Sequence, residues 1–260
     1  MRVITLAKFE EGVINEDAAI ARKEVIAVSD GAGGGGVFAD LWSKYLVENL
    51  PEKPIKNYKT FDKWIDGIWE PFYNECEEKA KTIGGMFLNK FYDEGSFATL
   101  IAVWKDGQWI SYGDSVAFCY NRKTKELQHS FTRLVDFNNP PYLINCKDPL
   151  DFNGFKSRKF DMDDDSVVFV ASDTLAHYIL MLYEVAHQDR FKEELQEAIN
   201  AQTKNSNFIK TSMAIKNIDF EKDVIRKLQN CSTWPFLQNH FKGLKKKGLI
   251  GHDDYSLAMF

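Results

Sequence analysis

Three features that would place the 260-residue chain in a special class are missing from its sequence. No apolar run reaches the roughly 20 residues that a membrane-spanning helix needs. The N-terminal segment has no apolar core of a signal peptide. The formal net charge is -5, whereas nucleic-acid-binding surfaces are basic. We therefore expect a cytoplasmic protein that binds neither membrane nor nucleic acid.

Cysteine is scarce as well, with four residues that show no close pairing. Two of them lie in apolar runs, and none has the spacing of a zinc site, so reduced thiols are expected. The remaining composition, with 44% hydrophobic and 27% charged residues, is typical of a globular protein. No linker-like segment divides the chain, which predicts a single domain over residues 1–260.

The most informative stretch combines a β-branched apolar run, a carboxylate and a series of glycines. Residues 25–29 read Val-Ile-Ala-Val-Ser, Asp30 follows, and four consecutive glycines end at Gly36. From residue 37 onward the apolar residues recur at helical spacing. The pattern predicts a buried strand, a tight turn and a helix, with Asp30 at the end of the strand.

Three interpretations of this stretch compete. Residues 31–36 satisfy the dinucleotide-binding pattern G-x-G-x-x-G, although a glycine-rich run meets it through composition alone. The glycines could also form a purely structural turn. In the third interpretation Asp30 is a metal ligand, and the glycines allow another group to approach the backbone closely. This last interpretation requires further carboxylates at other strand ends.

The remaining pattern favours an antiparallel arrangement. Strands are predicted in quick succession between residues 96 and 131, with turns and no helix between them, which argues against a βαβ nucleotide-binding domain. A long helical pattern covers residues 60–83, with a kink or break expected at Pro71. An irregular segment, residues 132–154, is predicted to be a surface loop, and a last strand is predicted for residues 255–260.

Carboxylates do occur at several predicted strand ends. Such a carboxylate is costly to bury unless it is paired or binds a cation. Several of them at one end of a sheet would repel one another, and hard divalent cations such as Mg²⁺ or Mn²⁺ resolve that repulsion. The residues in question are Glu16, Asp17, Asp30, Asp114, Asp173, Asp253 and Asp254.

Taken in order, six segments of the chain resemble the motifs of the metal-dependent Ser/Thr protein phosphatases, the PPM or type 2C family, in its bacterial style. They span nearly the whole chain in the order of that family and at roughly its spacing. The segments are Asn15-Glu-Asp, Val28-Ser-Asp-Gly-Ala-Gly-Gly, Gly95-Ser-Phe-Ala-Thr, Gly113-Asp-Ser, Val170-Ala-Ser-Asp and Asp253-Asp-Tyr-Ser.

The resemblance implies an α+β fold, a four-layer α/β/β/α sandwich in which two antiparallel β-sheets are flanked by helices. It also implies two Mn²⁺ or Mg²⁺ ions in a cleft at one end of the sandwich, and a third in many members. The implied activity is the hydrolysis of phosphoserine and phosphothreonine in a phosphoprotein substrate, without a covalent intermediate, by a water or hydroxide between the ions.

The resemblance further implies roles for individual residues. Asp30 would bridge both ions, and Asp173 and Asp253 would complete the protein ligands of the first, so Asp30 and Asp173 are the expected catalytic residues. Glu16 and the carbonyl group of Gly31 would hold the second ion. Asp114, together with Asp173, would hold a third and looser ion.

The chain departs from the family pattern at three places. Gly12 stands where an arginine usually binds the substrate phosphate, which leaves Lys8 as the nearest upstream candidate. Ala32 replaces a histidine of many eukaryotic members, and Thr174 replaces a glycine. No metal ligand is lost. An alternative therefore stays open: a catalytically weak or inactive phosphatase-like domain that binds a phosphoprotein or another partner.

Overall fold

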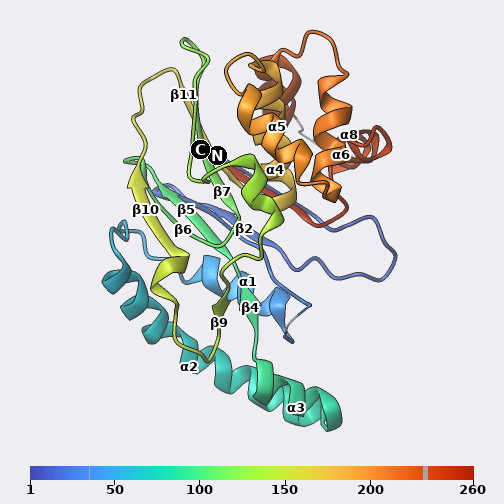
Figure 1. The fold of residues 1–260 in the computed structure, drawn as a ribbon. Helices are drawn as coiled ribbons and strands as arrows, with labels where there is room; N and C mark the ends of the chain where they lie inside the picture. Colours follow the sequence, from blue (N-terminus) through green and yellow to red (C-terminus); the bar gives the residue numbers. More distant parts are fainter. Residues whose placement is uncertain (35, 231–233) are drawn as a thin grey trace.

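The computed structural model describes residues 1–34, 36–230 and 234–260. Two five-stranded sheets form its centre, and every pairing within them is antiparallel (Figure 1). The first sheet has the order β1 (Arg2–Leu6), β12 (Tyr255–Met259), β11 (Ser166–Ala171), β7 (Val116–Asn121) and β8 (Leu127–His129). The second has the order β10 (Phe155–Lys159), β6 (Gln108–Tyr112), β5 (Leu100–Trp104), β3 (Val25–Ser29) and β2 (Ala18–Ala21).

The two sheets pack face to face, and β3 shows why its residues are apolar without alternation. Ile26 and Val28 point into the core between the sheets, together with Val170 of β11. Val25 and Ala27 point the other way, into a second core beneath helices. Both faces of the strand are therefore buried, which requires a continuous apolar run.

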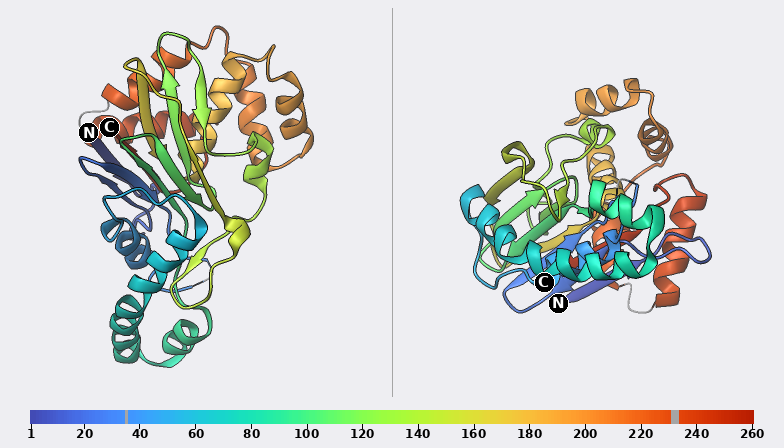
Figure 2. Two further views of the ribbon diagram at one scale, coloured as in Figure 1. Left: turned by 90° about the vertical axis from the view of Figure 1, so that its left-hand side faces the viewer. Right: turned by 90° about the horizontal axis from the view of Figure 1, so that it is seen from below.

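Helices cover the outer face of each sheet (Figures 1 and 2). On the second sheet lie α1 (Ala39–Glu48), α2 (Tyr58–Ile83) and α3 (Gly85–Glu94). On the first lie α4 (Asp173–Ala186), α5 (Lys192–Asn200), α6 (Lys204–Met213), α7 (Arg226–Asn230) and α8 (Trp234–Lys246), with a π-helical turn η3 (Glu221–Ile225) before α7. The predicted α/β/β/α sandwich is confirmed. None of the described helices is both long enough and apolar enough to cross a bilayer.

Helix α2 continues through Pro71, so of the kink or break expected there the break is wrong. Proline removes one backbone hydrogen bond and crowds the carbonyl group four residues earlier, here that of Gly67. Both residues lie on the exposed side of the helix, where water can satisfy that carbonyl group. The helix ends instead at Gly84, whose φ of 71° is readily adopted by glycine.

Two other predicted segments differ in the structure. The first of the strands predicted between residues 96 and 131 is divided into β4 (Phe97–Ala98) and β5, with Thr99 between them. The predicted surface loop contains two short helical turns, η1 (Leu134–Asn138) and η2 (Phe152–Gly154), and the strand β9 (Ile144–Asn145), which pairs with β4. The small β4–β9 sheet brings residues 141–143 close to the end of the sandwich.

Candidate active site

A pocket of about 280 Å³ opens at one end of the sandwich. All five carboxylates to which the family resemblance gives a metal-binding role line it, and so does Gly31. Three further residues without a carboxylate, Ala32, Gly33 and Thr99, line it too, together with Pro141 and Leu143 from the segment before β9. The lining residues are Glu16, Asp30, Gly31, Ala32, Gly33, Thr99, Asp114, Pro141, Leu143, Asp173 and Asp253.

The antiparallel topology explains why these residues meet. The end of β11 faces the starts of β7 and β12, because Ala171 pairs with both Val116 and Leu257. Asp173 follows β11, while Asp114 and Asp253 precede β7 and β12. All three residues therefore lie where these strands end or begin, at the same end of the first sheet.

The second sheet brings its carboxylates to the same end. Ala18 at the start of β2 pairs with Ser29 at the end of β3. Glu16, just before β2, and Asp30, just after β3, therefore lie at the same edge of that sheet.

Thr99 fixes the backbone at Asp30 through several hydrogen bonds. The N–H of Asp30 donates to Thr99 Oγ1 at 3.2 Å, and the N–H of Thr99 donates to the carbonyl oxygen of Asp30 at 2.8 Å. The Ser29 hydroxyl donates to the Thr99 carbonyl group at 2.6 Å, and Thr99 Oγ1 lies 2.8 Å from Ser115 Oγ. Thr99, which lies between β4 and β5, thus connects Ser29 and Asp30 with Ser115, the residue that follows Asp114.

Two glycines leave room for Glu16. A Cβ atom on Gly31 would lie 2.5 Å from the Glu16 carbonyl oxygen, which itself accepts hydrogen bonds from the Gly31 N–H at 3.2 Å and from Ser43 Oγ at 2.5 Å. A Cβ atom on Gly33 would lie 2.0 Å from Glu16 Oε1. The glycine-rich stretch therefore accommodates a carboxylate, and its strand β3 has only antiparallel neighbours, unlike a dinucleotide-binding βαβ unit.

Burial and mutual repulsion raise the pKa values of this cluster. Burial raises the pKa of Asp30 well above its usual range, and the charges of Asp17 and Asp173 raise it further. Burial, then the neighbouring Asp173, raises the pKa of Asp114 to about 7. Burial, then Asp253, raises the pKa of Asp173 to about 6. The cluster is thus short of positive charge, which protons or cations can supply.

Two acidic residues to which the sequence gave no role support the site. Burial raises the pKa of Asp17 well above the usual range, and its buried Oδ2 atom has no hydrogen-bond partner among the described residues. Asp254 accepts hydrogen bonds from the N–H groups of Lys8 at 2.7 Å and Glu16 at 2.8 Å. The motifs Asn15-Glu-Asp and Asp253-Asp contain both residues, but only the structure shows that Asp254 joins the N-terminal segment to the start of β12.

Lys8 does not line the pocket. Its positive charge nevertheless lowers the pKa of Glu16 and Asp253 against the larger effect of burial, so the ammonium group lies on their side of the site. Gly12 has a φ of 77°, and no atom lies within 4 Å of where its Cβ would be. The side chain of Thr174 lies next to Gly251, and both line a smaller, separate cavity to which Asp173 also contributes.

The donor chemistry of the pocket suits a hard divalent cation, because its charged groups are carboxylates with raised pKa values. However, no three His, Cys, Asp or Glu side chains within residues 1–34, 36–230 and 234–260 form a ready-made metal site.

Neither the family models nor the curated proteins include a match to the chain. Solved structures do match it at the level of the fold. The Mycobacterium tuberculosis serine/threonine phosphatase PstP/Ppp superposes with a TM-score of 0.52 at 14% identity, over 99% of this chain and 96% of that one. The catalytic domain of the serine/threonine protein phosphatase PstP in complex with two manganese ions gives 0.51 at 13% identity, over 99% and 95%. The chain therefore has the fold of the bacterial PPM-type Ser/Thr phosphatases.

Proposed function

We propose that the chain is a metal-dependent phosphoprotein phosphatase that hydrolyses phosphoserine and phosphothreonine. The observation that carries the proposal is the convergence of Glu16, Asp30, Asp114, Asp173 and Asp253 on one pocket. Convergence of these residue types from five strand ends has a cost in free energy, and a structural role alone gives no reason for it. The fold shared with Ser/Thr phosphatases supports the same assignment.

Within this proposal Asp30, Asp173 and Asp253 would hold one Mn²⁺ or Mg²⁺ ion, and Asp30, Glu16 and the Gly31 carbonyl group a second. Asp114 would serve a third and looser ion beside Asp173. When bound, paired divalent cations lower the pKa of a water molecule and neutralise charge on the transferring phosphoryl group. The manganese ions named for the PstP catalytic domain support this choice of metals.

The chain's own groups would position this chemistry. Thr99 and Asp254 accept hydrogen bonds from the backbone N–H groups of Asp30 and Glu16, respectively. These bonds fix the backbone positions from which the two carboxylate side chains extend. The pocket volume of about 280 Å³ accommodates a phosphoryl group with the short side chain that carries it. Pro141 and Leu143 form an apolar wall, which would limit the access of water to the phosphate.

The direct test is hydrolysis of 4-nitrophenyl phosphate and of a phosphothreonine peptide with Mn²⁺, with Mg²⁺ and with EDTA. We expect phosphate release with either ion and none with EDTA. Asp30→Asn should abolish it, whereas Asp164→Asn should not, because Asp164 is exposed and makes no side-chain hydrogen bond within the part of the chain that is described. Metal-saturated wild-type protein without activity on either substrate would contradict the proposal.

A second candidate is a phosphoprotein-binding module with little or no turnover. The position of Lys8 outside the pocket favours it, because none of the described residues that line the pocket is a lysine or an arginine. An arginine would bind a phosphate through two charge-assisted hydrogen bonds, and here that contribution is missing. Saturable binding of the phosphothreonine peptide by the Mn²⁺-loaded protein, without phosphate release, would favour this candidate.

A further inference from the structure

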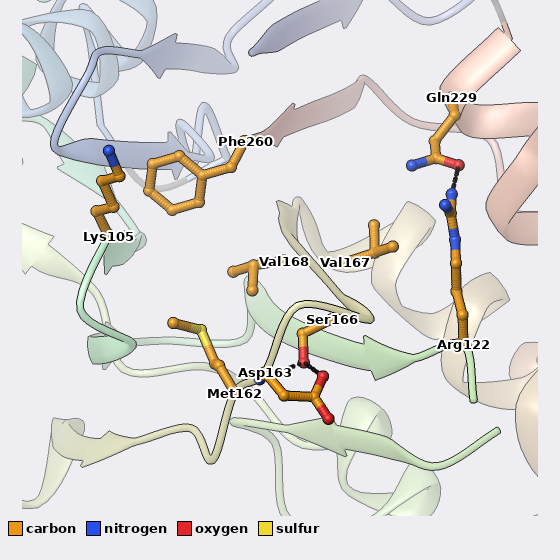
Figure 3. A pocket seen from close by; sticks show the side chains of 9 residues that line it. All are labelled: Lys105, Arg122, Met162, Asp163, Ser166, Val167, Val168, Gln229 and Phe260. Atoms are coloured by element: carbon orange, nitrogen blue, oxygen red, sulfur yellow. Dashed lines mark hydrogen bonds between the residues drawn. The ribbon is translucent and has the colours of Figure 1, made fainter. Parts of the chain in front are cut away.

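A second pocket, of about 360 Å³, lies at the opposite end of the sandwich from the carboxylates. Lys105 follows the end of β5 in the second sheet, and Arg122 follows the end of β7 in the first. Asp114 precedes that same strand β7, so the strand runs from the acidic site to the second pocket. The lining residues are Lys105, Arg122, Met162, Asp163, Ser166, Val167, Val168, Gln229 and Phe260, which together we call the cationic pocket (Figure 3).

The floor of the cationic pocket is the open end of the core between the sheets. Val168 belongs to that core, and the partly buried Met162 and Phe260 pack against it. Figure 3 shows these three side chains in the space between Lys105 on one side and Arg122 on the other. A ligand in this space would contact apolar surface between two cationic groups.

Neither cation is neutralised by a neighbour. Among the described residues, no carboxylate lies within salt-bridge distance of Lys105 or Arg122. The guanidinium group of Arg122 donates a hydrogen bond to Gln229 Oε1 at 2.5 Å, which is a neutral acceptor. Arg2 brings a third positive charge close by, because it donates to the carbonyl oxygen of Leu228 at 2.9 Å.

The one acidic residue of the pocket is already engaged. The carboxylate of Asp163 accepts hydrogen bonds from Asn121 Nδ2 at 2.8 and 2.7 Å, from Ser166 Oγ at 3.0 Å and from the N–H of Asp165 at 3.0 Å. These bonds occupy the oxygen atoms of Asp163 in closing the turn before β11. These donors are neutral, so Asp163 keeps its negative charge, and the side chains that line the cationic pocket carry one net positive charge.

We propose that the cationic pocket binds a small organic anion that has an apolar, preferably aromatic, body. The anionic group, a carboxylate, sulfonate or phosphate, would accept charge-assisted hydrogen bonds from Arg122 and Lys105. The body would cover Phe260, Met162 and Val168. The volume is in the range of small-molecule sites, which are typically about 300–1,000 Å³. Without bound metal ions, the acidic site at the other end would repel the same ligand.

The test uses 1-anilinonaphthalene-8-sulfonate, whose fluorescence rises in an apolar site, and its uncharged analogue N-phenyl-1-naphthylamine. Neither probe is a phosphate ester, so the outcome does not depend on the phosphatase proposal. We expect saturable binding of one sulfonate per chain and at least tenfold weaker binding of the uncharged analogue. A hydrogen bond to a charged group contributes about 1.5–3 kcal/mol, so Arg122→Gln should raise Kd about tenfold or more.

Lys105→Gln should raise the same Kd several-fold. The matched control is Lys123→Gln, because Lys123 is an exposed neighbour of Arg122 that does not line the pocket, and its Kd should match that of the wild type. Thermal unfolding midpoints of the three variants verify that each is folded. Absence of saturable binding, equal affinity for the uncharged analogue, or a Kd unchanged in both Arg122→Gln and Lys105→Gln would overturn the proposal.

Discussion

The contact between Gly33 and Glu16 gives a sharp test of the acidic site. A Cβ atom on Gly33 would lie 2.0 Å from Glu16 Oε1 and 2.6 Å from its Cδ, whereas ordinary contacts of such atoms begin at 3.4 Å. In Gly33→Ala the Glu16 carboxylate must therefore move by at least about 1 Å, since contacts of a Cβ atom under 3.0 Å essentially never occur. A displacement of about 1 Å in catalytic machinery can cost about 100-fold in rate.

Gly34→Ala is the matched control, because no atom of the described residues outside its chain neighbours lies within 4 Å of where its Cβ would be. Neither glycine has a positive φ, so alanine strains the backbone at neither position. The added methyl group of Gly34→Ala should leave activity unchanged and can stabilise the fold by about 0.4–1 kcal/mol through the unfolded chain.

The assay is hydrolysis of 4-nitrophenyl phosphate over a Mn²⁺ titration, paired with calorimetric titration of Mn²⁺ into each variant. We expect Gly33→Ala to lose about 100-fold in kcat/KM and to bind Mn²⁺ more weakly, with a thermal unfolding midpoint close to that of the wild type. If the Gly33→Ala and Gly34→Ala variants have the same rate and the same Mn²⁺ affinity, then Glu16 is not a metal ligand and the reasoning is refuted.

Three further predictions concern the same site. At saturating Mn²⁺, Asp30→Asn should lose about a thousandfold or more in kcat/KM, since several kcal/mol of charge stabilisation disappear. Asp114→Asn should lose less. Equal losses in the two variants that added Mn²⁺ does not relieve would contradict the assigned roles. Burial and neighbouring carboxylates raise the pKa of Asp114 to about 7 and that of Asp173 to about 6. In EDTA the folded chain therefore binds more protons than the unfolded chain between pH 4 and 7. The free energy of unfolding should then fall as pH rises through this range. Thermal unfolding from pH 5 to 8 measures that slope, which should be smaller in Asp114→Asn, and an unchanged slope in that variant would count against the raised pKa values. Lys8→Ala should raise KM for 4-nitrophenyl phosphate and Gly12→Arg should lower it, despite the φ of 77° at residue 12; if neither variant changes KM, substrate phosphate is bound elsewhere.

The parts of the fold that the sequence predicted are those encoded locally. Residues 25–29 form a continuous β-branched run because β3 is buried on both faces, and such a run indicates a strand without any knowledge of its neighbours. Asp30 and Asp173 share one local pattern, a Ser-Asp pair after an apolar strand. The pattern indicated a common edge, and the pocket contains both residues.

The parts that the sequence left open depend on distant contacts. Helix α2 passes Pro71 because the affected carbonyl group faces solvent, which periodicity does not reveal. Thr99 interrupts a strand because its hydroxyl and backbone bind Asp30. The cationic pocket joins Lys105, Arg122 and Phe260, which are far apart in the chain and form no motif. The metal-binding roles of the acidic residues, and the role of Lys8, stay predictions.

The central claim is that the acidic pocket is a two-metal active site. The most direct measurement is an anomalous difference map from crystals of the protein grown with excess Mn²⁺. We predict two Mn²⁺ peaks about 3.5–4 Å apart in the pocket, with a carboxylate oxygen of Asp30 bound to each ion and Glu16, Asp173 and Asp253 around them. A saturated crystal with no Mn²⁺ peak in the pocket, or with peaks that Asp30 does not contact, would contradict the account.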